Sequence, residues 1–133
     1  MEDKQVIELA FKAMNNAYAP YSNFHVGACV SCKDGAYFLG ANIENAAYPA
    51  GVCGERSAIF ATYSNGYRAK DIEKLAIVCD GDDIAAPCGV CRQVLNELLM
   101  PETPIILSNG KKTVYTNIKE LLPLSFGPEN LGK

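Results

Sequence analysis

The sequence lacks the features that would place the protein in a membrane or on a nucleic acid. No apolar run approaches the roughly 18 residues of a membrane-spanning helix. The first twelve residues carry charges between short apolar stretches, unlike a secretory signal. A formal net charge of −3 and a pI of about 5.1 argue against a polyanionic partner. We therefore expect neither a membrane nor a nucleic acid among its partners.

The chain also lacks internal repeats, low-complexity tracts and linkers, and it has little histidine. Its 133 residues suit one domain spanning residues 1–133. The single histidine, His25, alternates with apolar Phe24 and Val26, which predicts a strand residue that binds no metal. Six cysteines without a secretory signal favour a reducing compartment. We expect a cytoplasmic protein.

Helical and strand-like periodicities alternate along the chain, which indicates an α/β fold with a mixed sheet. Helices are predicted near residues 2–18, 53–65, 88–99 and 117–122, and strands near 24–32, 37–43, 74–79, 104–107 and 113–115. The turn at Lys33-Asp34-Gly35 makes the first two strands antiparallel, and Asn109-Gly110 does the same for the last two.

Two cysteine motifs carry most of the functional information. Cys53-Gly54-Glu55 precedes Pro87-Cys88-Gly89-Val90-Cys91. Three thiols leave one zinc position open, as in a catalytic site. A ligand-x-Glu element followed by Pro-Cys-x-x-Cys is typical of zinc deaminases of nucleobases. Both motifs are predicted to open helices, where the helix dipole lowers thiol pKa values.

The helical spacing sets one condition on this site. Cys88 and Cys91, three residues apart, lie on the same side of a first turn. Cys53 and Glu55, two apart, diverge on a regular helix, so both face a metal only if Cys53 lies at the helix edge. Three thiolates and Zn²⁺ sum to a charge of −1, which calls for a cation. Arg56 is the candidate, and the alternative is that it is a solvated helix charge.

Two other interpretations of the cysteines are weaker. Cys29 and Cys32 could join Cys88 and Cys91 in a structural four-thiolate site, but strand residues three apart face opposite sides of a sheet. Cys29, Cys32 and Cys79 are therefore predicted to be small core or surface thiols. A redox pair at Cys88 and Cys91 leaves Cys53 and Glu55 without a role.

Beyond the cysteines, the chain resembles the short, homotetrameric, three-cysteine form of the cytidine deaminase family. The matching segments are 19–27, Asn42-Ile-Glu-Asn-Ala-Ala-Tyr48, Cys53-Gly-Glu-Arg56, Pro87-Cys-Gly-Val-Cys-Arg-Gln93 and Leu121-Leu-Pro-Leu-Ser-Phe126. They cover essentially the whole chain. The resemblance implies a three-layer α/β/α fold with a five-stranded mixed sheet. The chain departs from the family at Gly54, where Ala is more common, a change that should not abolish function.

The resemblance also implies the roles of individual residues. Cys53, Cys88 and Cys91 would bind one Zn²⁺ per subunit, and Glu55 would be the catalytic acid and base. Phe24 would pack on the pyrimidine, Gly54 would lie beside the base, and Asn42 and Glu44 would bind the ribose 3′-hydroxyl. Ala46, Tyr48 and Phe126 would reach the pocket from neighbouring subunits of a homotetramer with shared active sites. From the residues alone, Phe24 is more typical of a core residue, and Asn42 and Glu44 suit a surface strand end equally well.

The expected function is zinc-dependent hydrolytic deamination of cytidine and deoxycytidine to uridine and deoxyuridine, with release of ammonia, in pyrimidine salvage. Glu55 would take a proton from water and return it to the substrate. The alternatives are a deaminase of a cytosine nucleoside antibiotic such as blasticidin S and, from another class, a non-catalytic zinc or redox module.

Overall fold

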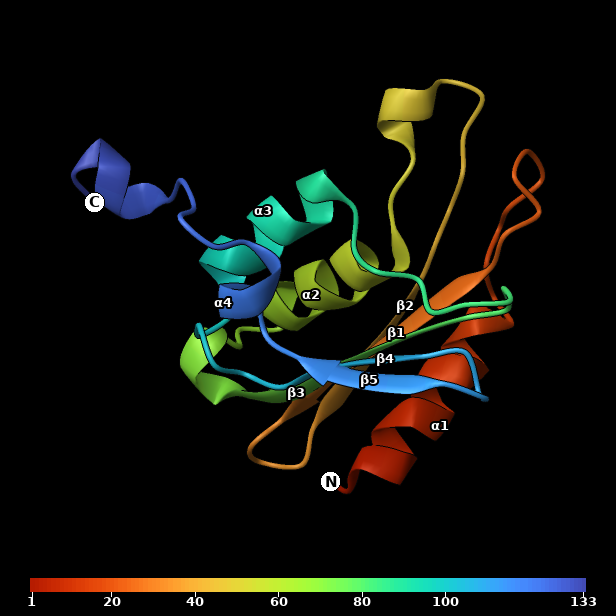
Figure 1. Cartoon of the computed structure of the whole chain (residues 1–133), viewed down its shortest axis with the longest axis horizontal. Coiled ribbons are helices and arrows are strands. Elements are labelled where there is room, and N and C mark those ends of the chain that lie inside the picture. Colours follow the sequence, from red (N-terminus) through yellow and green to blue (C-terminus); the bar gives the residue numbers. More distant parts are fainter.

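A five-stranded mixed sheet separates two helical layers in the computed structural model, which describes residues 1–133 (Figure 1). Helix α1 covers one face of the sheet, and α2, α3 and α4 cover the other. The helices are α1 (Asp3–Met14), α2 (Gly54–Ser64), α3 (Gly89–Leu98) and α4 (Ile118–Leu121). The strands are β1 (Val26–Cys32), β2 (Tyr37–Ala41), β3 (Ile72–Cys79), β4 (Ile105–Ser108) and β5 (Thr113–Thr116). The predicted three-layer fold is confirmed.

The strands lie in the order β2-β1-β3-β4-β5. Only β3 and β4 run parallel, and the crossover between them contains α3. The other pairs are antiparallel, including the two predicted from their turns. Because β3 continues into the loop that leads to α3, the end of this central strand delivers the second cysteine motif to the site.

Alternation along β1 divides the core into two parts. Ala28, Val30 and Cys32 pack with Ile59 of α2 and Leu95 of α3. Cys29 packs on the opposite face with Val6 and Ala10 of α1. The prediction that Cys29 and Cys32 face opposite sides of the sheet is therefore confirmed, and neither can join a four-thiolate site.

A glycine sets the distance between α1 and the sheet. A Cβ atom on Gly27 would lie 2.1 Å from the backbone oxygen of Ala10 and 2.5 Å from the backbone nitrogen of Met14. Such distances are well below van der Waals contact, so the helix backbone rests directly on β1 at this point.

Four predicted elements differ from the structure by two or more residues at one end, namely the first helix and the strands predicted at 24–32, 37–43 and 74–79. The first helix ends at Met14 and not at Tyr18, because Tyr18 forms a bridge with Ile43 and its N–H donates to the carbonyl of Asn42. The first strand begins at Val26, so His25 is not a strand residue; it lies in the loop that contains Asn23, whose φ is 55°. None of the helices has the length and apolar character needed to cross a membrane.

Candidate active site

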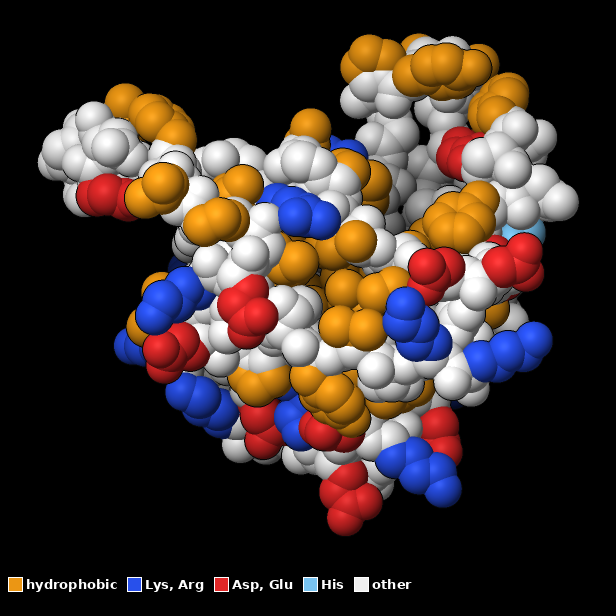
Figure 2. All heavy atoms as spheres, viewed as in Figure 1, with side chains coloured by type: hydrophobic (Ala, Val, Ile, Leu, Met, Phe, Trp, Pro, Cys, Tyr) orange, Lys and Arg blue, Asp and Glu red, His pale blue; other side chains and the backbone are white.

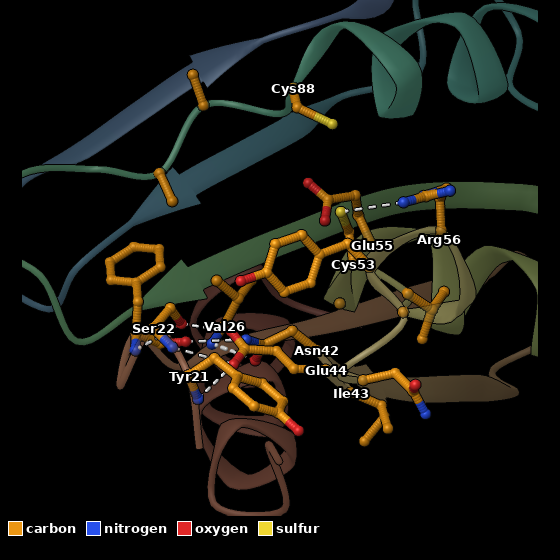
Figure 3. A pocket seen from close by; sticks show the side chains of 18 residues that line it. Tyr21, Ser22, Val26, Asn42, Ile43, Glu44, Cys53, Glu55, Arg56 and Cys88 are labelled. Carbon is orange, nitrogen blue, oxygen red and sulfur yellow. Dashed lines mark hydrogen bonds between the residues drawn. The ribbon is translucent and has the colours of Figure 1, made fainter. Parts of the chain in front are cut away.

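The first cysteine motif lies at the start of α2. Cys53 is the N-cap residue, with an extended backbone (φ −77°, ψ 155°), and Glu55 lies in the first helical turn. This geometry meets the condition set by the sequence, because Cys53 precedes the regular helix and is free to point where Glu55 points. The side chains of Cys53, Glu55 and Cys88 gather in one place (Figure 3). Glu55 is 5% exposed, which is unusual for a carboxylate.

The second motif lies at the start of α3. Cys88 is the N-cap residue, and its sulfur accepts a hydrogen bond from the backbone N–H of Cys91, 3.5 Å away. The sulfur atoms of Cys53, Cys88 and Cys91 lie within 4.8 Å of one another. Tetrahedral zinc with bonds of about 2.3 Å needs sulfurs about 3.8 Å apart, so small side-chain rotations suffice. Three thiols with no fourth protein ligand fit zinc with an open position.

Arg56 lies against this cluster and is not a solvated helix charge. Its Nη2 donates to the sulfur of Cys53 at 3.3 Å, and its buried Nε has no hydrogen-bond partner. Hydrogen bonds from the Cys91 thiol and from Arg56 lower the pKa of Cys53 to about 5, despite its partial burial. The pKa of Cys91 is raised because its thiol donates to Cys53 and because it is buried. The hydrogen bonds from Cys91 and Arg56 thus both favour the thiolate form of Cys53.

The environment of Glu55 disfavours its charged form. Burial raises the pKa of this carboxyl, the nearby Cys53 thiolate raises it further, and its own backbone N–H and Arg56 act in the opposite direction. A carboxyl whose pKa moves up from its ordinary range can both accept and return a proton near neutral pH.

A cavity of about 550 Å³ opens over the thiols (Figures 2 and 3). In Figure 2 the surface is hollowed beneath the projecting segment that carries the short helix η1 (Tyr48–Ala50). Most of the predicted site residues line this cavity: Phe24, Asn42, Glu44, Tyr48, Cys53, Gly54, Glu55, Arg56 and Cys88. Cys91 is fully buried behind them in the thiol cluster. Ala46 and Phe126 do not line it.

Asn42 and Glu44 organise the loop that carries Phe24. Asn42 accepts from the N–H of Val26 at 2.9 Å and donates to the carbonyl of Phe24 at 2.8 Å. The carboxylate of Glu44 accepts from the backbone N–H groups of Tyr21 and Ser22 and from the Ser22 hydroxyl. Both side chains therefore shape the cavity wall as well as lining it.

Several lining residues were missed by the sequence reasoning. Tyr21 and Ser22 lie within the segment 19–27 that matched the family, so a signal for them was present. Ala85 and Ala86 line the cavity from the loop before Cys88. They are small apolar residues in an irregular stretch, and no periodicity or motif marks them.

The C-terminal segment leaves its apolar side chains exposed. Gln93 and Asn96 of α3 both donate to the carbonyl of Phe126, which attaches this segment to α3. The Phe126 side chain is nevertheless 58% exposed, and Leu124 is fully exposed with φ 49°. This segment projects away from the three layers (Figure 1).

The remaining cysteines lie apart from the cavity. Cys29, Cys32 and Cys79 are buried, and the thiol of Cys79 donates to the carbonyl of Asp83. Burial raises the pKa of Cys29 to about 12 and that of Cys32 to about 11. These three thiols are part of the core.

Comparison with known proteins agrees with this geometry. A family model described as the cytidine and deoxycytidylate deaminase zinc-binding region matches residues 1–107. Cytidine deaminase from Halalkalibacterium halodurans is 42% identical over 98% of both chains. Cytidine deaminase from Sporosarcina psychrophila is 40% identical over 98% of this chain and 96% of the relative. The crystal structure of cytidine deaminase from Burkholderia pseudomallei superposes with a TM-score of 0.91 at 41% identity, covering 95% of this chain and 100% of the other.

Proposed function

The chain belongs to the cytidine and deoxycytidylate deaminase family, and on that premise we propose that it hydrolyses cytidine and deoxycytidine to uridine and deoxyuridine with release of ammonia. One observation carries the proposal: a buried carboxyl, Glu55, lies beside three clustered thiols at the base of a cavity. The full-length similarity to proteins named cytidine deaminase supports it.

The thiols of Cys53, Cys88 and Cys91 would hold one Zn²⁺ per chain. When bound, zinc supplies a Lewis acid that makes water a nucleophile near neutral pH. Arg56 offsets the excess negative charge of three thiolates, and in doing so limits the loss of Lewis acidity that electron-rich sulfur causes. Its hydrogen bond to Cys53 also orients that sulfur.

Glu55 moves the protons of the reaction. Its carboxylate accepts a proton from the attacking water and delivers it to N3 of the pyrimidine, which makes C4 more electrophilic. It then takes the remaining proton of the nucleophile and passes it to the departing 4-amino group, which leaves as ammonia. The raised pKa of Glu55 suits both roles. A carboxylate with a higher pKa is a stronger base, and more of it is present as the proton-donating acid near neutral pH.

The cavity wall supplies groups for the nucleoside. The ring of Phe24 would pack on the pyrimidine, with Gly54 beside the base, and Asn42 and Glu44 would bind the 3′-hydroxyl. Glu44 already accepts several hydrogen bonds, which hold its carboxylate in place for a sugar hydroxyl.

The charges of the cavity favour a nucleoside over a nucleotide within this family. Arg56 is the one Lys or Arg among its 18 lining residues, and its guanidinium faces Cys53. Glu44 and Glu55 add negative charge. A 5′-phosphate would enter this cavity without a cation from the same chain to pair with, a cost that a nucleoside does not meet.

The assembly proposed here is a homotetramer with shared active sites, each chain being a single domain of residues 1–133. The exposed side chains of Leu124, Phe126 and Leu131 lie on a projecting segment, which suits burial against another copy. Phe126 and Ala46, which do not line the chain's own cavity, would complete a neighbour's, and Tyr48 would contribute across the same interface. We place the enzyme in the cytoplasm, in pyrimidine salvage.

One assay tests the proposal. Zinc-replete protein is mixed separately with cytidine, deoxycytidine and cytidine monophosphate, and the fall in cytosine absorbance is followed. We expect conversion of both nucleosides and at least tenfold lower kcat/KM for the monophosphate. No conversion of either nucleoside by protein with about one zinc per chain would overturn the proposal, and blasticidin S would then be tested. Molar mass in solution tests the tetramer.

A further inference from the structure

His25 and Asp80 form a two-point contact at the edge of the cavity. The ring Nδ1 of His25 lies 2.6 Å from one carboxylate oxygen of Asp80, and the backbone N–H of His25 donates to the other at 3.0 Å. The backbone N–H of Asp80 returns a bond to the carbonyl of His25 at 3.3 Å. The two residues thus form a clasp between the Phe24 loop and the end of β3.

The hydrogen-bonding chemistry of the Asp80 carboxylate determines which atom of this clasp carries a proton. Partial burial works against ionisation of Asp80, but the hydrogen bonds from the backbone and ring of His25 keep the pKa of Asp80 below its ordinary value. An ionised carboxylate only accepts hydrogen bonds, so Nδ1 of His25 carries a proton. The neutral Nδ1–H tautomer and the protonated ring both satisfy this requirement, and the clasp does not depend on the charge of His25.

The residues next to the clasp lie in contact with each other. A Cβ atom on Gly81 would lie 2.9 Å from Cε1 of Phe24, so the Phe24 ring packs directly on the backbone at Gly81. Phe24 lines the cavity, and so do Ala85 and Ala86 farther along the loop that Asp80 begins. Each member of the clasp is therefore one residue away from a Phe24–Gly81 contact that forms part of the cavity wall.

We propose that His25 is a positioning residue, whose clasp with Asp80 holds the ring of Phe24 against Gly81 and so sets the aromatic wall that receives the pyrimidine. This inference rests on the proposed function, because it concerns how the nucleoside is bound.

Other bonds attach Phe24 to a different part of the molecule. Its N–H donates to the hydroxyl of Ser22, and its carbonyl accepts from Asn42, which follows β2. These bonds hold the backbone of Phe24, while the clasp joins the loop to the end of β3. Loss of the clasp therefore loosens the ring without releasing the loop, and binding weakens without being abolished.

The expected effect lies in KM. The side chains of His25 and Asp80 are 34% and 38% exposed, and exposed pairs contribute up to about 1 kcal/mol, which corresponds to about fivefold in binding. His25→Ala should raise KM for cytidine about three- to fivefold and leave kcat unchanged, since Glu55 and the thiols are untouched. His25→Asn, whose amide Nδ2 can donate from about the place of Nδ1, should recover most of the loss.

A double-mutant cycle separates the clasp from general weakening of the fold. Asp80→Ala also removes the acceptor of the His25 backbone N–H, so it should raise KM at least as much as His25→Ala. The double variant should be no worse than Asp80→Ala, because all three variants lose the bond between the His25 ring and the Asp80 carboxylate. Lys119→Ala, which removes the exposed pair of Lys119 with Glu102, is the matched control and should leave KM unchanged. A merely structural role would lower the melting temperature and leave the KM of the folded enzyme unaltered.

Several outcomes overturn the proposal: an unchanged KM in His25→Ala, a loss confined to kcat, additive effects in the double variant, or no recovery in His25→Asn. Should His25→Ala not fold, Gly81→Ala displaces the same ring from the other side, and an unchanged KM there also overturns it. Wild-type protein that does not convert cytidine counts against the proposed function itself. An active wild type with unaltered variants overturns the clasp alone.

Discussion

Nη2 of Arg56 donates to the sulfur of Cys53 at 3.3 Å, across the boundary between the N-cap and the first turn of α2. The bond places a permanent cation against one of three thiols that would all be deprotonated around a divalent ion. Three thiolates, Zn²⁺ and one guanidinium sum to zero. Arg56 would therefore make a zinc-loaded site of three thiolates electrically neutral.

Arg56→Ala should weaken zinc binding by about tenfold or more, as loss of a partner of a metal ligand generally does. The Cys53 thiolate loses its hydrogen bond, and a negative charge is left uncompensated. Zinc competition with a chromogenic chelator measures the change. Arg56→Lys is the matched variant, because it retains the charge without the guanidinium geometry. Its zinc affinity should lie between those of the wild type and Arg56→Ala. Equal zinc affinity in all three proteins would assign Arg56 no role in the site.

Glu55→Gln should reduce kcat by about 10² or more, because the amide neither accepts nor returns a proton. The substitution conserves size, and the carboxyl is not among the three metal ligands, so zinc content should remain about one per chain. Metal analysis and the absorbance assay on the same sample test both statements. Zinc-loaded Glu55→Gln with nearly normal turnover would remove Glu55 from the mechanism.

The thiols should fall into two classes after zinc is removed. In zinc-loaded protein, Cys53, Cys88 and Cys91 are protected as ligands, and Cys29, Cys32 and Cys79 are protected by burial, so a native thiol titration should detect almost none. After chelation, Cys53 should be among the first thiols to react, because the hydrogen bonds from Cys91 and Arg56 lower its pKa and it is partly exposed. Cys29, with its pKa raised to about 12, should stay unreactive until unfolding.

The same titration distinguishes a redox module. A redox pair would show Cys88 and Cys91 cycling between a disulfide and two thiols without any chelator. Removal of zinc that exposes no additional reactive thiol would contradict the three-cysteine site.

Gly27→Ala should destabilise the fold by about 3 kcal/mol or more, at or beyond the upper end for overpacking a core. The new methyl would lie 2.1 Å from the backbone oxygen of Ala10, and a helix backbone cannot rotate away as a side chain can. Urea unfolding measures the change. Gly89→Ala is the matched control, because no atom lies within 4 Å of its Cβ position. Equal stabilities of these two variants would refute the close packing of α1 on β1.

Local sequence patterns predicted most helices and strands. They were wrong where a contact between distant segments sets the conformation of the backbone. The apolar spacing of Val6, Ala10 and Ala13 identified α1, and these residues are indeed buried. That spacing continues to Ala17, but the backbone of Tyr18 pairs with Asn42 and Ile43, far along the chain. Similarly, His25 alternates with apolar neighbours, yet it lies in a loop, where its backbone N–H and its ring bond to Asp80. The residues next to Tyr18 and His25 in the sequence give no indication of these distant partners.

The sequence by itself determined which groups can supply the metal chemistry and the carboxyl that we propose as catalytic, because both depend on residue types and short spacings. Cys88 and Cys91 lie on one turn, and Glu55 follows Cys53 by two residues, so their relations are encoded within a few positions. Only the tertiary structure decided that the two motifs meet, since β3 must carry one helix start to the other. It also decided the burial that raises the pKa of Glu55 and the contacts of Phe24 with Gly81. These depend on distances between segments far apart in the chain, which spacing along a sequence does not contain.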